Sequence, residues 1–127
     1  MVDRSSVLII DNNAEELMQL ITYMEDKYDL TDVSSGEECI DKAPNICPDV
    51  ILVDDMIVEP NCYDVCQALK SDPVTGEIPI ILMSDLTADE LEDEVGYLGS
   101  DDYICKPIDK KELLEKIDTL LAFSRAH

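Results

Sequence analysis

The sequence of 127 residues is poor in positive charge. Nine lysines and arginines stand against 30 aspartates and glutamates, and the formal net charge is −21. Such a surface repels phosphate backbones and anionic lipid headgroups, so direct binding to nucleic acid or to a membrane surface is disfavoured. Cations, or a basic patch on another protein, suit this charge better. The hydrophobic content of 46% nevertheless argues against wholesale disorder.

Metal-binding thiol pairs and long apolar segments are also missing. His127 is the only histidine and no CxxC pair occurs among the five cysteines, so a zinc site is disfavoured. The odd cysteine count indicates reduced thiols and a cytoplasmic location. No apolar run is long enough to span a membrane, and no signal peptide pattern is present. We expect residues 1–127 to form one domain with its own hydrophobic core.

Short apolar runs bounded by polar residues are the strongest structural signals that the chain contains. The run 50–54 lies between Pro48 and a pair of carboxylates, and it is typical of a strand buried on both faces of a parallel sheet. Similar runs occur at 7–10 and 79–83, and weaker strands are expected at 29–33 and 102–105.

Segments with helical spacing separate these strands. The helices are expected at 14 to about 27, after Ser34, through Val65 and Leu69, at about 88–98 with Val95 inward, and at 109–123. Five successive βα units with right-handed crossovers require a parallel sheet with helices on both faces. The predicted fold is therefore a three-layer, doubly wound α/β domain.

Polar side chains stand where the strongest strands end. The pairs are Asp11-Asn12, Asp54-Asp55, Ser84-Asp85 and Lys106-Pro107. Because the carboxyl ends of parallel strands share one edge of a sheet, we expect these side chains to lie together. Two carboxylates and a loop carbonyl suit Mg²⁺, while a hydroxyl and an ammonium can hold phosphoryl oxygens. The set describes aspartyl-phosphate chemistry.

Four segments in order, 7–11, 48–54, 78–84 and 99–107, resemble the response-regulator receiver domains, the CheY-like family. The resemblance covers the whole chain and implies the flavodoxin-like strand order 2-1-3-4-5. It also implies that Asp54 accepts a phosphoryl group from the phosphohistidine of a sensor histidine kinase or phosphotransfer protein. By this resemblance the chain is a signalling module rather than an enzyme.

The same resemblance assigns roles to the other site residues. Asp11, Asp54 and the Met56 carbonyl would ligate Mg²⁺, with Asn12 beside them. Ser84 and Lys106 would contact the phosphoryl oxygens. Tyr103 would be the aromatic that reorients with Ser84 on activation, and the bond preceding Pro107 would be cis.

The sequence departs from the family pattern at five positions, Asn12, Asp55, Val58, Cys62 and Asp85. Asn12 stands in place of a second acid and should weaken Mg²⁺ binding. Asp55 adds charge, although strand alternation should aim it away from Asp54. Cys62 would be strained only at a positive φ. Asp85 could narrow access for the phosphoryl group.

Three other functions remain open at this stage. The first is a pseudo-receiver that interacts with partners but takes no phosphate. The second is a haloacid-dehalogenase-like phosphatase, which would need an aspartate where Met56 stands. The third is a flavin-binding module, whose phosphate loop would be repelled by the acids after the first strand.

The partners and the extent of the whole protein are also predicted only in outline. A homodimer through the fourth helix, fifth strand and fifth helix would pair Lys110, Lys111 and Lys116 with nearby acids. The chain is either a stand-alone regulator or a receiver from a longer protein.

Overall fold

The computed structural model describes residues 4–57, 60–87, 89–91 and 100–126. Within them, five parallel strands form one sheet in the order β2-β1-β3-β4-β5. This result confirms the predicted fold class. The strands are β1 (Ser6–Ile10), β2 (Asp29–Val33), β3 (Val50–Asp54), β4 (Ile80–Ser84) and β5 (Asp102–Cys105).

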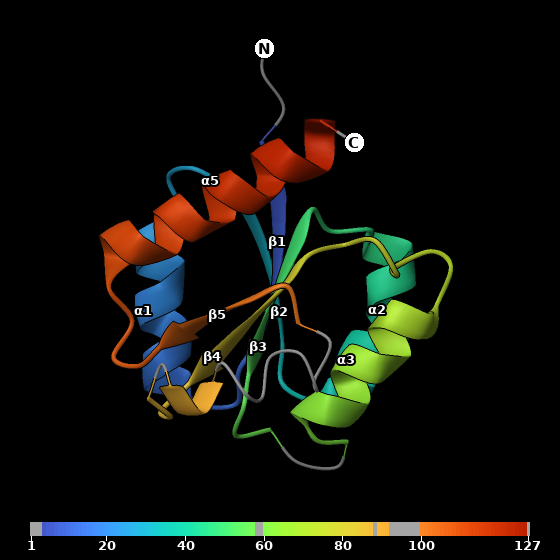
Figure 1. Ribbon diagram of the computed structural model, residues 1–127, viewed down its shortest axis with the longest axis horizontal. Helices are drawn as coiled ribbons and strands as arrows, with labels where there is room; N and C mark the ends of the chain where they lie inside the picture. The colour runs from blue at the N-terminus through green and yellow to red at the C-terminus, as the bar shows by residue number, and fades with distance from the viewer. Residues whose placement is uncertain (1–3, 58–59, 88, 92–99, 127) are drawn as a thin grey trace.

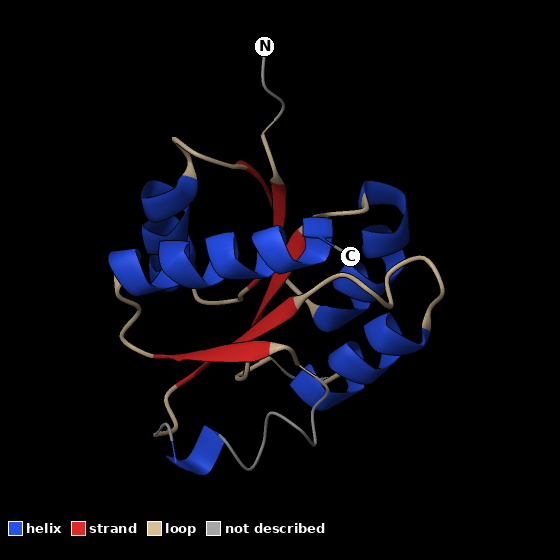
Figure 2. Ribbon diagram, turned by 45° about the horizontal axis from the view of Figure 1, so that its top comes forward, coloured by secondary structure: helices blue, strands red, loops and turns tan. Residues whose placement is uncertain are grey.

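Helices cover both faces of this sheet, as Figure 1 shows and as the view coloured by element type in Figure 2 repeats. The helices α1 and α5 lie on one face, and α2 and α3 lie on the other. Their bounds are α1 (Ala14–Met24), α2 (Gly36–Ile46), α3 (Cys62–Ser71) and α5 (Lys110–Ala126). Residues 89–91 are helical, whereas the rest of the helix predicted at about 88–98, including Val95, lies outside the described residues, as does Val58.

Three element boundaries differ from the predicted ones by a few residues. Helix α1 ends at Met24 rather than near Lys27, because the amides of Lys27 and Tyr28 both donate to the Met24 carbonyl and form a tight turn. Strand β4 begins one residue after Pro79, which has no N–H to give to the sheet. Helix α5 begins after Asp109, whose carboxylate caps the Glu112 amide at 2.9 Å.

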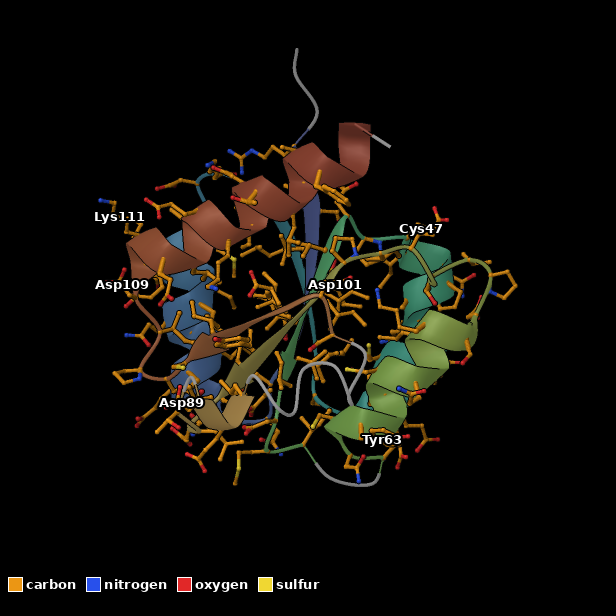
Figure 3. All side chains as sticks on the ribbon, viewed as in Figure 1. Cys47, Tyr63, Asp89, Asp101, Asp109 and Lys111 are labelled. Atoms are coloured by element: carbon orange, nitrogen blue, oxygen red, sulfur yellow. The ribbon has the colours of Figure 1, made fainter. Side chains whose placement is uncertain are left out.

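Strand alternation divides the hydrophobic core into two layers. Val7, Ile9 and Leu52 pack on the side of α1 and α5, whereas Leu8 and Ile51 pack on the side of α2 and α3. Figure 3 shows the two sides, with Asp109 and Lys111 at the start of α5 far from Tyr63 on α3. Because both layers are filled, the central strands have no exposed face, and the polar groups that follow them gather at one edge.

No helix in the described part of the chain has the length and apolar character needed to cross a membrane.

Candidate functional site

Strand register brings the predicted site residues to one edge of the sheet. Asp54 lies opposite Met83 and Ser84 lies opposite Cys105, so the ends of β3, β4 and β5 are adjacent. Asp11 follows β1 and Lys106 follows β5 at the same edge. Residues separated by almost a hundred positions in the chain thus share one site.

Asp54 is the buried centre of this site. The residue is 1% exposed, and its Oδ1 accepts hydrogen bonds from Lys106 Nζ at 2.7 Å and from the Met56 amide at 3.3 Å. The Lys106 ammonium also lies 2.9 Å from Glu16 Oε1. Burial would lower the pKa of Lys106, but the bonds to the two carboxylates outweigh it and raise that pKa. Lys106 therefore stays charged beside Asp54.

Asp11 has a buried oxygen without a partner. The residue is 1% exposed, and its Oδ1 accepts the Asn13 amide at 2.8 Å, whereas Oδ2 has no hydrogen-bond partner among the described residues. Burial raises the pKa of Asp11 to about 6, against the Asn13 hydrogen bond, and the charges of Asp54 and Glu16 raise it further. An unsatisfied buried carboxylate beside other carboxylates is an environment that a cation would relieve.

Three carboxylates at this edge could hold such a cation. Asp11, Glu16 and Asp54 each offer an oxygen, and these atoms lie within 4.8 Å of one another. Carboxylate oxygens are the preferred ligands of Mg²⁺, so the residues present fit that ion. Glu16 is not among the site residues predicted from the sequence, where it stands as one of two acids in the first turn of α1. The sequence does contain one indication of its position: Glu16 stands four residues before Leu20, a core residue, and therefore lies on the same face of α1.

The two other predicted metal contacts have less support in the geometry. Asn12 is exposed, and the Met56 side chain is 61% exposed. The Met56 amide bonds to Asp54, which places its backbone beside the site. A role for the Met56 carbonyl or for Asn12 in holding the ion stays a prediction.

Ser84 makes a hydrogen bond that was not anticipated. Its hydroxyl donates to Asp55 Oδ2 and accepts the Leu86 amide at 3.0 Å. Burial raises the pKa of Asp55, although the Ser84 bond and the charge of Lys106 oppose that shift. Asp55 thus points toward Ser84 rather than into the three-carboxylate cluster, which agrees with strand alternation.

The structure also describes four other positions that the sequence singled out: Pro107, Tyr103, Cys62 and Asp85. The Lys106–Pro107 peptide bond is cis. Tyr103 is half-buried, and its ring centroid lies 5.3 Å from Lys116 Nζ. Cys62 is the first residue of α3, so it is not held at a positive φ, and Asp85 is exposed.

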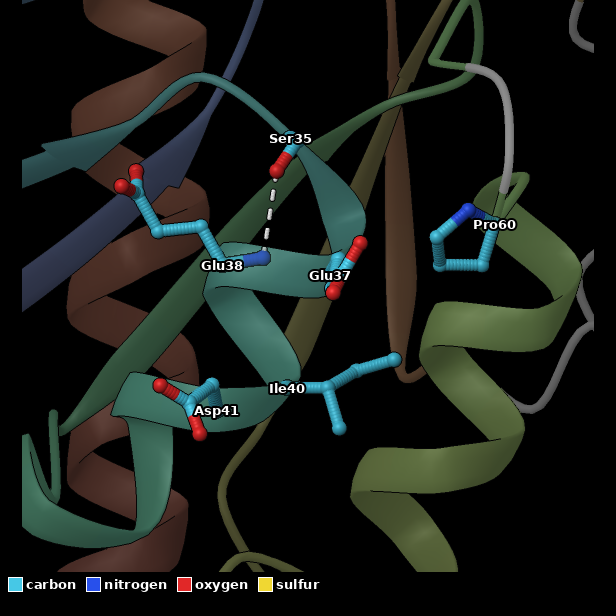
Figure 4. Close-up of a pocket in the computed structure, with 6 residues that line it drawn as sticks. All are labelled: Ser35, Glu37, Glu38, Ile40, Asp41 and Pro60. Atoms are coloured by element: carbon cyan, nitrogen blue, oxygen red, sulfur yellow. Dashed lines mark hydrogen bonds between the residues drawn. The ribbon is translucent and has the colours of Figure 1, made fainter.

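Two hollows lie near this edge. One of about 280 Å³ is lined by Glu16, Asp85, Lys106 and Pro107, among others, and opens beside the carboxylates. Another of about 790 Å³ lies between α2 and Pro60, and Figure 4 shows the acids Glu37, Glu38 and Asp41 around it. The second hollow contains none of the predicted site residues, whereas Lys106 and Pro107 line the first.

Residues 7–118 match the family described as the response regulator receiver domain. Among curated proteins, the chain is similar to the DNA-binding dual master transcriptional regulator RpaA of Synechocystis sp., at 31% identity over 91% of this chain and 48% of RpaA. The chain spans about half the length, or less, of the curated relatives that it matches.

Solved structures share the fold. A signal receiver domain of a signal transduction histidine kinase from Syntrophus aciditrophicus is 27% identical, with a TM-score of 0.84 over 93% of this chain and 90% of that one. The receiver domain of sensor histidine kinase PA1611 from Pseudomonas aeruginosa PAO1 is 18% identical, with a TM-score of 0.86 over 94% of this chain and 98% of that one. In the PA1611 domain a magnesium ion is coordinated in the active site cleft.

Proposed function

Because this chain belongs to the response regulator receiver domain family, we propose that Asp54 accepts a phosphoryl group and switches the domain between two conformations. The donor is a phosphohistidine of a sensor histidine kinase or of a histidine phosphotransfer protein. The observation that best supports this proposal is the buried Asp54 carboxylate at the carboxyl edge of the sheet. Its Oδ1 accepts a hydrogen bond from Lys106 Nζ at 2.7 Å.

The transfer needs only groups that the site holds and the donor supplies. An ionised Asp54 oxygen attacks phosphorus, a new P–O bond forms, and the P–N bond to the donor imidazole breaks with its electron pair going to nitrogen. Lys106 holds Asp54 and offers its charge to the phosphoryl oxygens. Mg²⁺, when bound, supplies neutralising charge to those oxygens. Asp11 and Asp54, with the Met56 carbonyl and Asn12 nearby, would hold the ion.

The conformational change begins at Ser84. In the unmodified protein the Ser84 hydroxyl donates to Asp55. A phosphoryl group on Asp54 adds a stronger acceptor, and Ser84 would exchange Asp55 for it. The loop that follows β4 would then shift, and the half-buried Tyr103 on β5 would reorient with it.

The proposal also covers the cellular location of the domain, the residues that form it and its relation to DNA-binding outputs. We propose that the domain is a signalling module of one unit over residues 1–127, located in the cytoplasm, in keeping with its reduced cysteines. RpaA is described as DNA-binding, but the charge of −21 disfavours DNA contact by this chain itself. Any DNA-binding output would belong to a partner or to another part of a larger protein.

The proposal includes a homodimer through the fourth helix, β5 and α5, although most of the fourth helix lies outside the described residues. Lys116 pairs with Asp102 of the same chain at 3.2 Å. Lys110 and Lys111 at the start of α5 are exposed and could still face acids of a second copy. We keep the dimer as a secondary proposal, whose test is sedimentation with and without beryllofluoride.

Incubation with acetyl phosphate and Mg²⁺ tests the phosphoryl transfer. Intact mass should rise by one acid-labile phosphoryl group, and Asp54→Asn should abolish the gain because no nucleophile remains. Asp55→Asn is the matched control, since it removes the same charge one residue away, and it should still be modified. Modification of Asp54→Asn, or none of the wild type, would contradict the proposal and favour the pseudo-receiver.

A further inference from the structure

The acid pair at the end of the first strand is incomplete in this chain, yet a third carboxylate reaches the site from helix α1. Glu16 Oε1 lies 2.9 Å from Lys106 Nζ, and Glu16 joins Asp11 and Asp54 in a cluster whose oxygens lie within 4.8 Å. We propose that Glu16 is a direct ligand of the divalent cation and supplies the carboxylate that Asn12 does not. This inference rests on the proposed function and assigns a residue to it.

The start of α1 fixes Glu16 in this position. The Asn13 side chain caps the helix by accepting the amides of Glu15 at 3.0 Å and Glu16 at 3.1 Å, and the Asn13 amide itself donates to Asp11. The Asp11 carboxylate therefore orients Asn13, and the Asn13 cap orients the first turn of α1, which carries Glu16. Side chains in a helix lean toward its N-terminus, which for α1 means toward the carboxyl edge of the sheet. The cluster is thus organised before any ion arrives.

The surroundings of the cluster also point to a cation. Asp11 belongs to the cluster, and its buried Oδ2 has no hydrogen-bond partner in the described part of the chain. Lys106 contacts Glu16 and Asp54, and among the described residues it is the one ammonium that pairs with this cluster. When the three carboxylates are ionised, that ammonium leaves two formal negative charges, which one divalent cation would neutralise.

The neighbouring residue provides a matched comparison. Glu15 has the same side chain and adjoins Glu16, but it is exposed, whereas the Glu16 side chain is 30% exposed. Glu15 and Glu16 differ by about 100° around the helix, so only Glu16 shares the face of Leu20. Glu15→Gln therefore removes one negative charge from the same turn of α1 without removing a carboxylate from the cluster.

Calorimetric titration of the unphosphorylated protein with Mg²⁺ tests the assignment. Glu16→Gln should weaken Mg²⁺ binding roughly tenfold or more, as expected for loss of a ligand, and Glu15→Gln less than about twofold. Glu16→Asp keeps the net charge and shortens the reach by one methylene, and it should also weaken binding. Asn12→Asp should restore part of the affinity in the Glu16→Gln background.

Two results would overturn the assignment of Glu16 as a ligand. Both are measured by Mg²⁺ binding, independently of whether Asp54 is phosphorylated. Equal affinities of Glu16→Gln and Glu15→Gln would show that Glu16 does not contact the ion. An unchanged Glu16→Asp would show that Glu16 acts through its charge alone. Phosphorylation of Asp54 is scored by mass in the same variants. Glu16→Gln should need more Mg²⁺ for half-maximal modification but reach the wild-type extent at saturation. A wild type that binds Mg²⁺ through Glu16 but takes no phosphoryl group would refute the function alone.

Discussion

At the scale of single residues, the site holds a charge that the cation-free fold tolerates poorly. The Asp11 carboxylate is buried, one of its oxygens has no partner in the described structure, and its neighbours include Asp54 and Glu16. Its pKa is raised to about 6, whereas an exposed aspartate titrates near 3.8. The folded state therefore binds a proton on Asp11 more tightly than the unfolded chain does, and ionisation of Asp11 opposes folding.

The sign of this linkage gives a pH prediction. The contribution of Asp11 to stability falls as pH rises through about 6, so cation-free protein should gain stability as pH drops from 7 toward 5. Asp11→Asn removes the ionisable group and should raise the free energy of unfolding at pH 7 by about 2–3 kcal/mol, with a smaller gain at pH 5. Urea unfolding in EDTA at both pH values measures this.

Asp32→Asn is the control, because Asp32 is exposed on β2 and the substitution removes the same charge. It should change stability by less than about 0.5 kcal/mol. An Asp11→Asn protein less stable than wild type at pH 7 would mean that the buried carboxylate is better solvated than its contacts indicate.

At the scale of elements, the close approach of α2 to the segment before α3 depends on one glycine. Gly36 begins α2, and a Cβ placed there would collide with Val65 Cγ2 and lie 2.9 Å from the Pro60 carbonyl oxygen. Val65 is fully buried in the layer between these helices and the sheet. The glycine is therefore required by packing rather than by an unusual φ.

Gly36→Ala should destabilise the protein by about 1–3 kcal/mol, because a methyl group would overpack this junction. Destabilisation would point to the collision, since alanine is otherwise a better helix former than glycine by about 1 kcal/mol and would stabilise the helix. Denaturant unfolding measures the change. Glu37→Ala at the next, exposed position should be close to neutral.

A double variant separates the collision from other effects of the substitution. In a Val65→Ala background the Cγ2 atom is gone, so the added cost of Gly36→Ala should shrink. If Gly36→Ala stabilises the protein, or costs the same in both backgrounds, the contact with Val65 does not limit the approach of these helices.

At the scale of the whole molecule, the acidic excess is offset at only a few points. Described ion pairs engage five lysines, Lys27, Lys42, Lys70, Lys106 and Lys116. The formal charge of −21 remains spread over a small domain. Charges of one sign confined to a compact fold repel one another, and unfolding relaxes that repulsion.

Added salt should therefore raise the melting temperature of the cation-free protein. The Debye length falls from about 10 Å at 0.1 M to about 3 Å at 1 M, so repulsion between distant acids is screened. Scanning calorimetry in EDTA, from low NaCl to about 0.5 M, measures the shift, and choline chloride serves as the control for sodium binding. A melting temperature that falls with both salts would show that the surface ion pairs outweigh the repulsion.

The sequence alone was sufficient for the fold class and for the edge of the sheet at which the predicted polar residues gather. The runs 7–10 and 50–54 are apolar on both strand faces, and only a sheet covered on both sides buries such runs. Polar residues placed directly after these runs, such as Asp54 and Lys106, must then meet at the carboxyl edge. These inferences are local, since each follows from the order of residues within one element and from the handedness of the crossovers.

Only the tertiary structure decided which side chains touch there. Glu15 and Glu16 are indistinguishable as first-turn acids, and the packing of α1 through Leu20 brings Glu16 alone to Lys106. Ser84 likewise donates to Asp55, a contact that depends on the register of β3 and β4. A hydrogen bond requires its two atoms to lie within about 3 Å of each other. The spacing of residues in the sequence predicts only which helical turn or strand face a side chain occupies. The packing of the elements therefore determines which partners come within that distance.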